Sequence, residues 1–273
     1  MPIEQIIVLA LIQGITEFLP ISSSGHLILA PTIFGWADQG VLTDVMTHMG
    51  SLLAVVVYFW RDVVAMLRGC IDALRGRITD EGRLAFYIAI GTIPIVIAGA
   101  VVKLTGLSDH LRSPTLVAWN AIIFGLLLYF ADVYGLMRRT VAEMTWKPAL
   151  IIGFAQALSL NPGTSRSGIT MTAARFLGFV RPEAARFSFL LSIPATAAAG
   201  LLVIGEAVKA GEPITHGAVI TGALTFLVAL ATIAVLMQLV RRMSFLPFVI
   251  YRVVLGVVLL ALIYSGMPLG AVN

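Results

Sequence analysis

The sequence predicts an all-α protein that crosses a membrane several times and is built as an inverted-topology repeat. Of its 273 residues, 59% are hydrophobic and 12% are charged, and the mean hydropathy is +0.98. A soluble domain has about 25% charged residues. Several segments are long and apolar enough to span a bilayer, and two further apolar regions are interrupted by polar residues. The composition excludes a disordered chain and an ordinary soluble enzyme.

A spanning helix needs about 20 mostly apolar residues. The segments that meet this requirement are 44–60, 85–104, 114–136, 186–205, 217–240 and 247–264. Regions 3–34 and 148–180 are each long enough for two half-helices, but Pro, Gly, Ser and charged residues interrupt them. Irregular backbone at membrane depth is tolerated only where protein shields it or where it lines a wet cavity. We therefore expect each region to form a re-entrant helix pair.

The basic residues predict the orientation, because cytoplasmic loops are enriched in Lys and Arg. Loops 61–83 and 137–147 are rich in Arg, whereas loops 105–113 and 206–216 carry one basic residue each. This pattern places the Arg-rich loops inside and both termini outside. The first re-entrant pair then enters from the outer face and the second pair from the inner face.

The two interrupted regions also predict the repeat. Pro20-x-x-Ser23 aligns with Pro162-x-x-Ser165, and three spans follow each pair. Because three is an odd number, the second half is inverted relative to the first. We expect one membrane domain of two halves, residues 1–136 and 137–273, with a polar site near the bilayer midplane where the breaks meet.

The first break supplies candidate catalytic side chains. Gln13 and Glu17 are four residues apart on one face of a helix that Pro20 must end or kink. Ser23 and His26 are three residues apart, so in a helical turn the imidazole could reach the hydroxyl and activate it. The alternative is that a Ser-rich turn merely caps a broken helix. Glu17 favours function, because an ionisable residue inside a bilayer is costly.

The second break predicts an anion site. A turn at Gly163 opens into a half-helix, whose free N–H groups and positive dipole end favour an anion. The guanidinium of Arg166 suits phosphate oxygens, and hydroxyls flank it at Ser165, Ser167 and Thr170. The alternative is that Arg166 only forms a structural pair with Glu17.

The remaining signals are weaker. His48 lies four residues after Asp44, so both could face one cavity or share a local hydrogen bond. The net charge of +4, from 18 basic and 14 acidic residues, lies mostly in short loops and gives no dense basic face for nucleic acid. Cys70 is the single cysteine, so no internal disulfide can form.

Two motifs resemble those of a known family. The segment at 13–26, with Q-x-x-x-E and S-S-S-G-H, and P-G-T-S-R-S-G-I-T at 162–170 resemble the undecaprenyl-diphosphate phosphatases associated with bacitracin resistance. D-V-M-T-H-M-G-S at 44–51 and F-x-P-F-x-x-Y-R at 245–252 extend the resemblance over the whole chain.

The resemblance implies a role for several residues. The family's paired acidic motif falls on Gln13 and Glu17, where Gln at the first position is a variant that the pattern allows. The implied catalytic pair is Ser23 and His26, and the implied phosphate-binding group is Ser165, Arg166, Ser167 and Thr170. Arg166 would also neutralise charge that develops in the transition state.

The implied activity is hydrolysis of undecaprenyl diphosphate to undecaprenyl phosphate in a bacterial plasma membrane. This reaction recycles the lipid carrier of cell-wall synthesis, and bacitracin is connected only through the shared substrate. Because the half that carries Glu17, Ser23 and His26 enters from outside, we expect the site to open to the outer face. Ser23, His26 or an activated water could be the nucleophile. Glu17 could orient the histidine or bind Mg²⁺ or Ca²⁺, since magnesium needs few protein carboxylates. A homodimer is one candidate assembly.

Two other functions remain open on the residues. A prenyl-phosphate transporter or flippase would share the repeat architecture and the anion site, but it would not need a serine–histidine pair. An intramembrane serine protease would need the pair without the Arg-containing anion site.

Overall fold

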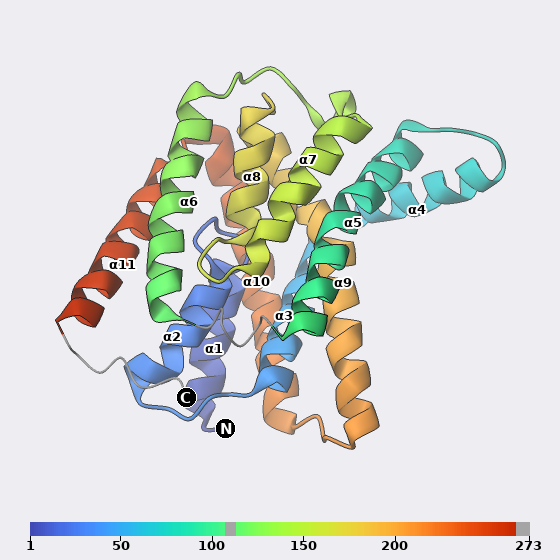
Figure 1. Ribbon diagram of the computed structural model, residues 1–273. Coiled ribbons are helices and arrows are strands. Elements are labelled where there is room, and N and C mark those ends of the chain that lie inside the picture. Colours follow the sequence, from blue (N-terminus) through green and yellow to red (C-terminus); the bar gives the residue numbers. More distant parts are fainter. Residues whose placement is uncertain (107–112, 266–273) are drawn as a thin grey trace.

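The computed structural model describes residues 1–106 and 113–265, and within these ranges all named elements of secondary structure are helices. Figure 1 shows a bundle in which short helices in the middle are surrounded by longer ones. Among the described residues, six helices are long and apolar enough to cross a membrane. Large apolar side chains such as Ile97, Phe130 and Val254 are exposed on these helices, as expected for surfaces that face lipid.

The first half of the chain contains a short helix pair and then longer helices. These are α1 (Ile3–Thr16), α2 (Ser23–Phe34), α3 (Val41–Tyr58), α4 (Trp60–Leu74), α5 (Asp80–Thr105) and α6 (Pro114–Tyr134). The second half begins with another short pair and continues with three long helices. These are α7 (Trp146–Ala157), α8 (Arg166–Phe176), α9 (Arg181–Ala210), α10 (His216–Arg242) and α11 (Leu246–Tyr264).

The predicted spans are confirmed as α3, α5, α6, α9, α10 and α11, with ends within a few residues of those expected. Both interrupted regions form two short helices joined by a turn. The expected loop 105–113 lies largely outside the described residues.

The segment 61–83, which we expected to be a loop between two spans, is largely helical. Helix α4 occupies most of that range and projects to one side of the bundle in Figure 1. It crosses the start of α5 closely, because a Cβ atom on Gly69 would lie 2.3 Å from the backbone nitrogen of Gly82. The apolar and charged residues of α4 lie on opposite faces, as in an amphipathic helix. The helix carries too many charged residues to be a membrane span.

The long helices pack closely because glycines face one another. A Cβ atom on Gly50 of α3 would lie 2.1 Å from the carbonyl oxygen of Gly222 of α10. Across the two halves, α1 packs against α10 and α7 packs against α5. One short helix of each half is therefore packed on a long helix of the opposite half.

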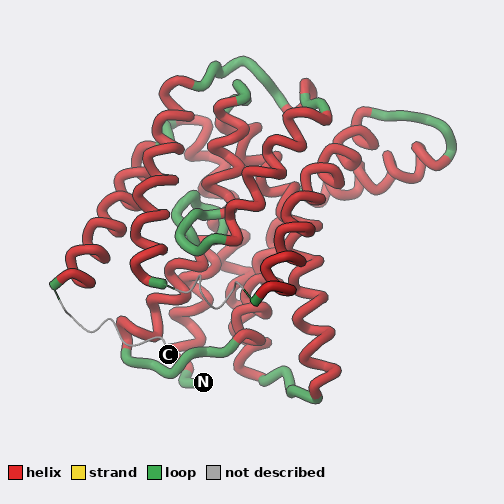
Figure 2. Tube along the Cα trace, viewed as in Figure 1, coloured by secondary structure: helices red, strands yellow, loops and turns green. Residues whose placement is uncertain are grey.

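The turns of the two short pairs lie together at the centre of the molecule, where Figure 2 shows them as loops surrounded by helices. Ser22 precedes α2 with φ 76°, and Ser165 precedes α8 with φ 70°. These serines are 143 residues apart, one residue more than the spacing of the Pro-x-x-Ser motifs indicates. The left-handed conformation is rare for residues other than Gly, so its occurrence in both turns marks them as equivalent.

Candidate functional site

Glu17 is the centre of the candidate site. It ends α1 in the middle of the bundle, with 8% of its surface exposed. Its Oε1 atom accepts a hydrogen bond of 2.7 Å from Nη2 of Arg166, the first residue of α8. Its Oε2 atom accepts bonds of 2.6 Å from Oγ of Ser23 and 3.1 Å from Nε2 of Gln13. The ion pair considered from the sequence is formed, and it joins the two halves of the chain.

The turn before α2 aims Ser23 at this carboxylate. Proline at position 20 cannot continue a helix, and the left-handed conformation of Ser22 reverses the chain before α2 begins at Ser23. Oγ of Ser22 lies 3.3 Å from Oγ of Ser24. The result is a buried hydroxyl that is hydrogen-bonded to a carboxylate, which is the arrangement needed to activate a nucleophile.

The expected contact between Ser23 and His26 is not formed. Nδ1 of His26 donates to the carbonyl oxygen of Ser22 over 2.7 Å, and Nε2 lies 2.6 Å from the hydroxyl of Tyr251 on α11. The rings of His26 and Tyr251 are nearly parallel, with centroids 5.7 Å apart. The imidazole reaches the carbonyl of the preceding turn rather than the neighbouring hydroxyl. His26 therefore bonds the turn that precedes α2 and does not contact Ser23.

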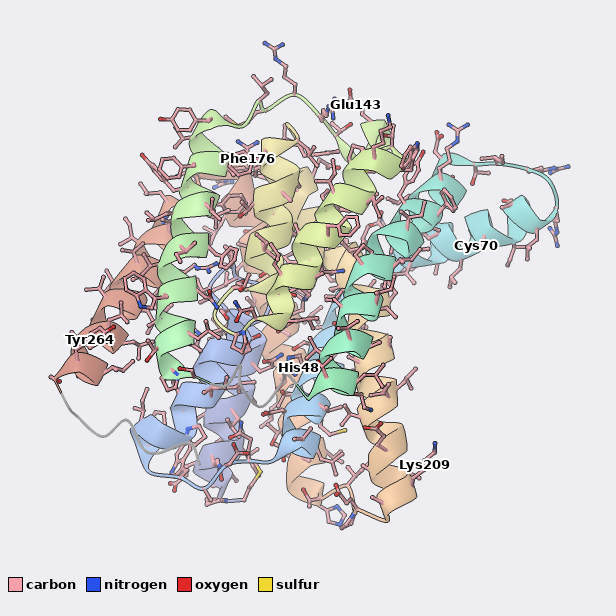
Figure 3. The ribbon with its side chains drawn as sticks, in the orientation of Figure 1. His48, Cys70, Glu143, Phe176, Lys209 and Tyr264 are labelled. Carbon is pink, nitrogen blue, oxygen red and sulfur yellow. The ribbon has the colours of Figure 1, made fainter. Side chains whose placement is uncertain are left out.

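A different histidine lies beside the carboxylate. Nε2 of His48, on α3, is 3.7 Å from Oε2 of Glu17. Its Nδ1 donates to the carbonyl oxygen of Asp44 over 2.8 Å. Figure 3 shows His48 near the centre of the bundle. The sequence motif at 44–51 contains this histidine, but its spacing from Asp44 gave no indication of Glu17.

The hydroxyls of the second break hold the turn together. Oγ of Ser165 accepts a bond of 3.1 Å from the backbone N–H of Gly168 and caps α8. Oγ of Ser167 donates to the carbonyl of Leu19 over 3.0 Å, and the hydroxyl of Thr170 lies 2.6 Å from that of Ser188. These predicted phosphate ligands are buried, and none of them lines a cavity beside Glu17.

Arg166 is the predicted anion-binding residue that does reach a cavity. Its Nη2 bonds Glu17, while its buried Nη1 atom has no hydrogen-bond partner among the described residues. A buried donor of this kind is costly unless a ligand satisfies it. Gly163, in the same turn, has φ 86° and leaves its carbonyl pointing away toward α11.

Arg252 of α11 contacts both turns, which its place in the sequence did not reveal. Its guanidinium is fully buried and donates to the carbonyls of both turns and of α6. The acceptors are Pro20, Gly163 and Thr164 in the turns and Asn120 and Ala121 in α6, at 2.9–3.2 Å. One side chain therefore fixes both breaks relative to each other.

Two cavities meet at the site. One, of about 380 Å³, is lined by Glu17 and Arg166 and by apolar side chains of α3 and α9, including Val45 and Val203. The other, of about 260 Å³, lies between α2, α3 and the end of α5. His48 lines both cavities. The site thus combines a charged end with a long apolar wall.

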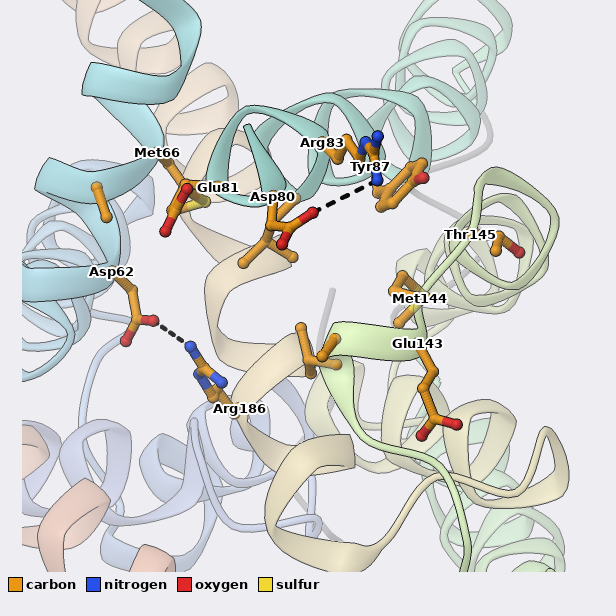
Figure 4. A pocket seen from close by; sticks show the side chains of 14 residues that line it. Asp62, Met66, Asp80, Glu81, Arg83, Tyr87, Glu143, Met144, Thr145 and Arg186 are labelled. Carbon is orange, nitrogen blue, oxygen red and sulfur yellow. Dashed lines mark hydrogen bonds and ion pairs between the residues drawn. The ribbon is translucent and has the colours of Figure 1, made fainter. Parts of the chain in front are cut away.

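A third cavity, of about 420 Å³, lies elsewhere, between α4, α5, α9 and the short helix η2 (Val141–Glu143). Figure 4 shows its charged lining, in which Asp62 pairs with Arg186 and Asp80 pairs with Arg83. None of the predicted site residues lines it.

Glu17, where the sequence led us to expect Mg²⁺ or Ca²⁺, is not part of a preformed cluster of metal ligands among the described residues. Both carboxylate oxygens already accept hydrogen bonds, from Arg166, Ser23 and Gln13. The described part of the chain holds no group of three His, Cys, Asp or Glu side chains placed to bind a metal. The expected Mg²⁺ or Ca²⁺ at Glu17 stays a prediction, and no chemical step is derived through it.

Comparisons with known proteins agree on one family. The sequence model described as "Bacitracin resistance protein BacA" matches residues 6–258. The undecaprenyl-diphosphatase of Maricaulis maris is 51% identical over 265 residues, covering 95% of this chain and 98% of that protein. The undecaprenyl-diphosphatase of Ruegeria pomeroyi is 49% identical over 97% of this chain and 100% of the relative, and that of Chromohalobacter salexigens is 49% identical over 93% and 97%.

Proposed function

The chain belongs to the bacitracin resistance protein BacA family and hydrolyses undecaprenyl diphosphate, and we propose that Ser23, Glu17 and Arg166 carry out this reaction. The observation that supports the assignment is the bond of 2.6 Å from Ser23 to a carboxylate that also pairs with Arg166. It places a nucleophile, a proton acceptor and an anion-binding group within one buried site.

Ser23 is the nucleophile in this proposal. Its oxygen attacks the terminal phosphorus, the bond from that phosphorus to the bridging oxygen breaks, and undecaprenyl phosphate leaves with the electron pair. Glu17 takes the hydroxyl proton. Water then attacks the phosphoserine, inorganic phosphate leaves, and the serine oxygen regains a proton. Of the nucleophiles considered from the sequence, Ser23 is favoured over His26 because both ring nitrogens of His26 are engaged elsewhere.

Arg166 binds the diphosphate and stabilises the charge that develops in the transition state, which is a major part of catalysis in phosphoryl transfer. Its free Nη1 atom supports this role. Ser165, Ser167 and Thr170 act indirectly, because their hydrogen bonds hold the turn and α8 in place. Gln13 orients Glu17 through its bond of 3.1 Å.

The first part of the prenyl tail lies in the apolar cavity between α3 and α9, and the rest extends into the lipid. The wall of this cavity contains Val41, Val45, Ala199 and Val203, and its charged end contains Glu17 and Arg166. An amphipathic substrate with a diphosphate head and a hydrocarbon tail matches this distribution of polar and apolar groups.

The multi-pass membrane protein is, in our proposal, an inverted repeat in a bacterial plasma membrane with its site open to the outer face. Gln13 and Gln156, Ser22 and Ser165, and Gly25 and Gly168 are each 143 residues apart. The packing of α1 on α10 and of α7 on α5 supports the same symmetry. The Arg-rich loops predict that the end of the bundle near α4 lies inside.

The transporter or flippase alternative is not favoured. A carrier would need Arg166 and the cavity, but it would not need a serine hydroxyl bonded to a carboxylate at the same place. The names of the relatives also describe a phosphatase.

The test is phosphate release from undecaprenyl diphosphate by purified protein in detergent. We expect Ser23→Ala and Arg166→Gln to lose about 100-fold or more of the wild-type rate, while Ser265→Ala, at the exposed end of α11, serves as the control. Ser23→Ala should also fail to form a phosphoenzyme. Full activity of Ser23→Ala would overturn the assignment of the nucleophile.

A further inference from the structure

We propose that His48 is the proton acceptor behind Glu17, so that the proton of Ser23 passes through Oε2 of Glu17 to Nε2 of His48. The proposal rests on the function assigned above and adds a residue to it. His48 acts through Glu17 and does not itself contact the reacting phosphorus.

The hydrogen bond at the other ring nitrogen sets the tautomer. A carbonyl oxygen can only accept, so Nδ1 of His48 carries the hydrogen that bonds Asp44. In the neutral ring, Nε2 therefore has a free electron pair. That atom lies 3.7 Å from Oε2 of Glu17, the same oxygen that accepts the Ser23 hydrogen bond. A small movement would bring the two atoms within hydrogen-bond distance, as catalytic contacts often tighten when substrate binds.

Glu17 is poorly placed to keep the proton. It accepts hydrogen bonds from Arg166, Gln13 and Ser23, and all three favour its ionised form. Its side chain is 7% exposed, whereas that of His48 is 34% exposed and lines both cavities. The imidazole thus connects the buried carboxylate with the space through which a proton can leave.

The charged and titratable groups around His48 favour this route. Glu17 lies at the end of α1, Asp44 one turn away on α3 itself, Asp38 in the loop before α3, and Arg166 at the start of α8; each lines a cavity that His48 also lines. The residues that α5 and α9 contribute to these cavities are uncharged. Carboxylates beside the ring stabilise the imidazolium that forms when it takes the proton.

The proton balance of the reaction is complete with His48. In the first step the Ser23 proton ends on Nε2, while the phosphorus–oxygen bond forms at Ser23 and breaks at undecaprenyl phosphate. In the second step the oxygen of water bonds the phosphorus as the bond from phosphorus to Ser23 breaks. The proton held by His48 returns through Glu17 to the Ser23 oxygen, and the proton that water loses leaves on the inorganic phosphate. No oxidant, reductant or other reactant is required.

The experiment compares His48→Gln, His48→Ala and His26→Gln with wild type, using His216→Gln, at the start of α10, as the matched control. Steady-state rates with undecaprenyl diphosphate are measured from pH 5 to pH 9. We expect His48→Gln to lower kcat by about 100-fold with a much smaller change in KM, and to remove the acid limb of the wild-type pH profile. Free imidazole should restore part of the activity of His48→Ala.

His26→Gln should lose activity through its effect on the turn, but it should keep the acid limb. The proposal is overturned if folded His48→Gln keeps the wild-type kcat, or if it loses activity without any change in the shape of the pH profile. Ser23→Ala, measured in parallel, distinguishes a failure of the proposed function from a failure of the proton transfer to His48. An active Ser23→Ala would contradict the proposed function. An inactive Ser23→Ala beside a fully active His48→Gln would contradict only the proton transfer.

Discussion

Arg252 allows the sharpest test of how the two breaks are held together. Its guanidinium is fully buried, no ion pair with a carboxylate joins it among the described residues, and it donates to the carbonyls of Pro20, Gly163 and Thr164 in the two turns. The substitution Arg252→Met keeps an unbranched apolar side chain of similar length and removes every donor.

The magnitude follows from the turn carbonyls. Leaving a buried acceptor without a partner costs about 1–3 kcal/mol, so three of them sum to about 3–9 kcal/mol before relaxation. Removing the buried charge offsets part of this destabilisation, because the desolvation of the guanidinium no longer opposes folding. We expect a net loss of about 3–5 kcal/mol, a large part of the roughly 5–15 kcal/mol of a typical folded protein.

The assay is reversible unfolding in mixed detergent micelles, followed by tryptophan fluorescence, together with phosphate release. Arg241→Met, at the exposed end of α10, removes an equal charge without touching the turns and serves as the control. If Arg252→Met unfolds within about 1 kcal/mol of wild type, which is the range of an ordinary single mutation, and keeps its activity, then the turns are not held by this residue.

The remaining predictions concern packing, backbone conformation, hydrogen bonding and metal dependence. Gly50→Ala should destabilise the protein by about 1–3 kcal/mol, because its Cβ atom would meet the backbone of α10, whereas Gly205→Ala, with no atom within 4 Å, should stabilise it by about 0.5–1 kcal/mol; chemical unfolding of the pair measures both. Ser22→Gly should be more stable than Ser22→Ala by about 1–2 kcal/mol, because only Gly adopts φ 76° without strain, and equal stabilities would argue against strain at this turn. Tyr251→Phe, which removes the hydroxyl beside His26, should lower stability by about 0.5–1.5 kcal/mol and leave the pH profile of kcat unchanged. Treatment with EDTA should abolish phosphate release, and Mg²⁺ or Ca²⁺ should restore it, if the predicted cation takes part; unchanged activity would contradict that prediction.

Most of the fold could be predicted because a bilayer imposes strict requirements on length and apolarity. The six spans follow directly from these requirements. Helix α4 was missed because its charges resemble those of a loop when only hydropathy is considered, although Val63, Leu67 and Ile71 recur at helical spacing. Such a helix is recognised by its periodicity rather than by its mean hydropathy.

The site was predictable in its components but not in its contacts. Glu17 and Arg166 stood out because charges at membrane depth are rare. The Ser23–His26 contact failed because spacing along a regular helix says nothing about a left-handed residue at Ser22, which starts a new helix and turns the hydroxyl toward α1. His48 is brought to Glu17 only by tertiary packing, and no local pattern encodes that proximity.

The pairing of Glu17 with Arg166 also has a consequence for the order in which the protein is made. The two residues are 149 positions apart, so during synthesis the carboxylate emerges long before its partner exists. A lone carboxylate is expensive inside a bilayer, and the first short pair therefore cannot settle at its final depth until α8 has been inserted. In a growing chain the turn between α1 and α2 would stay near water. Ser23 would be buried beside Glu17 only after the second half of the chain has been inserted. The site around Glu17 would then form only when the second half of the chain has been inserted.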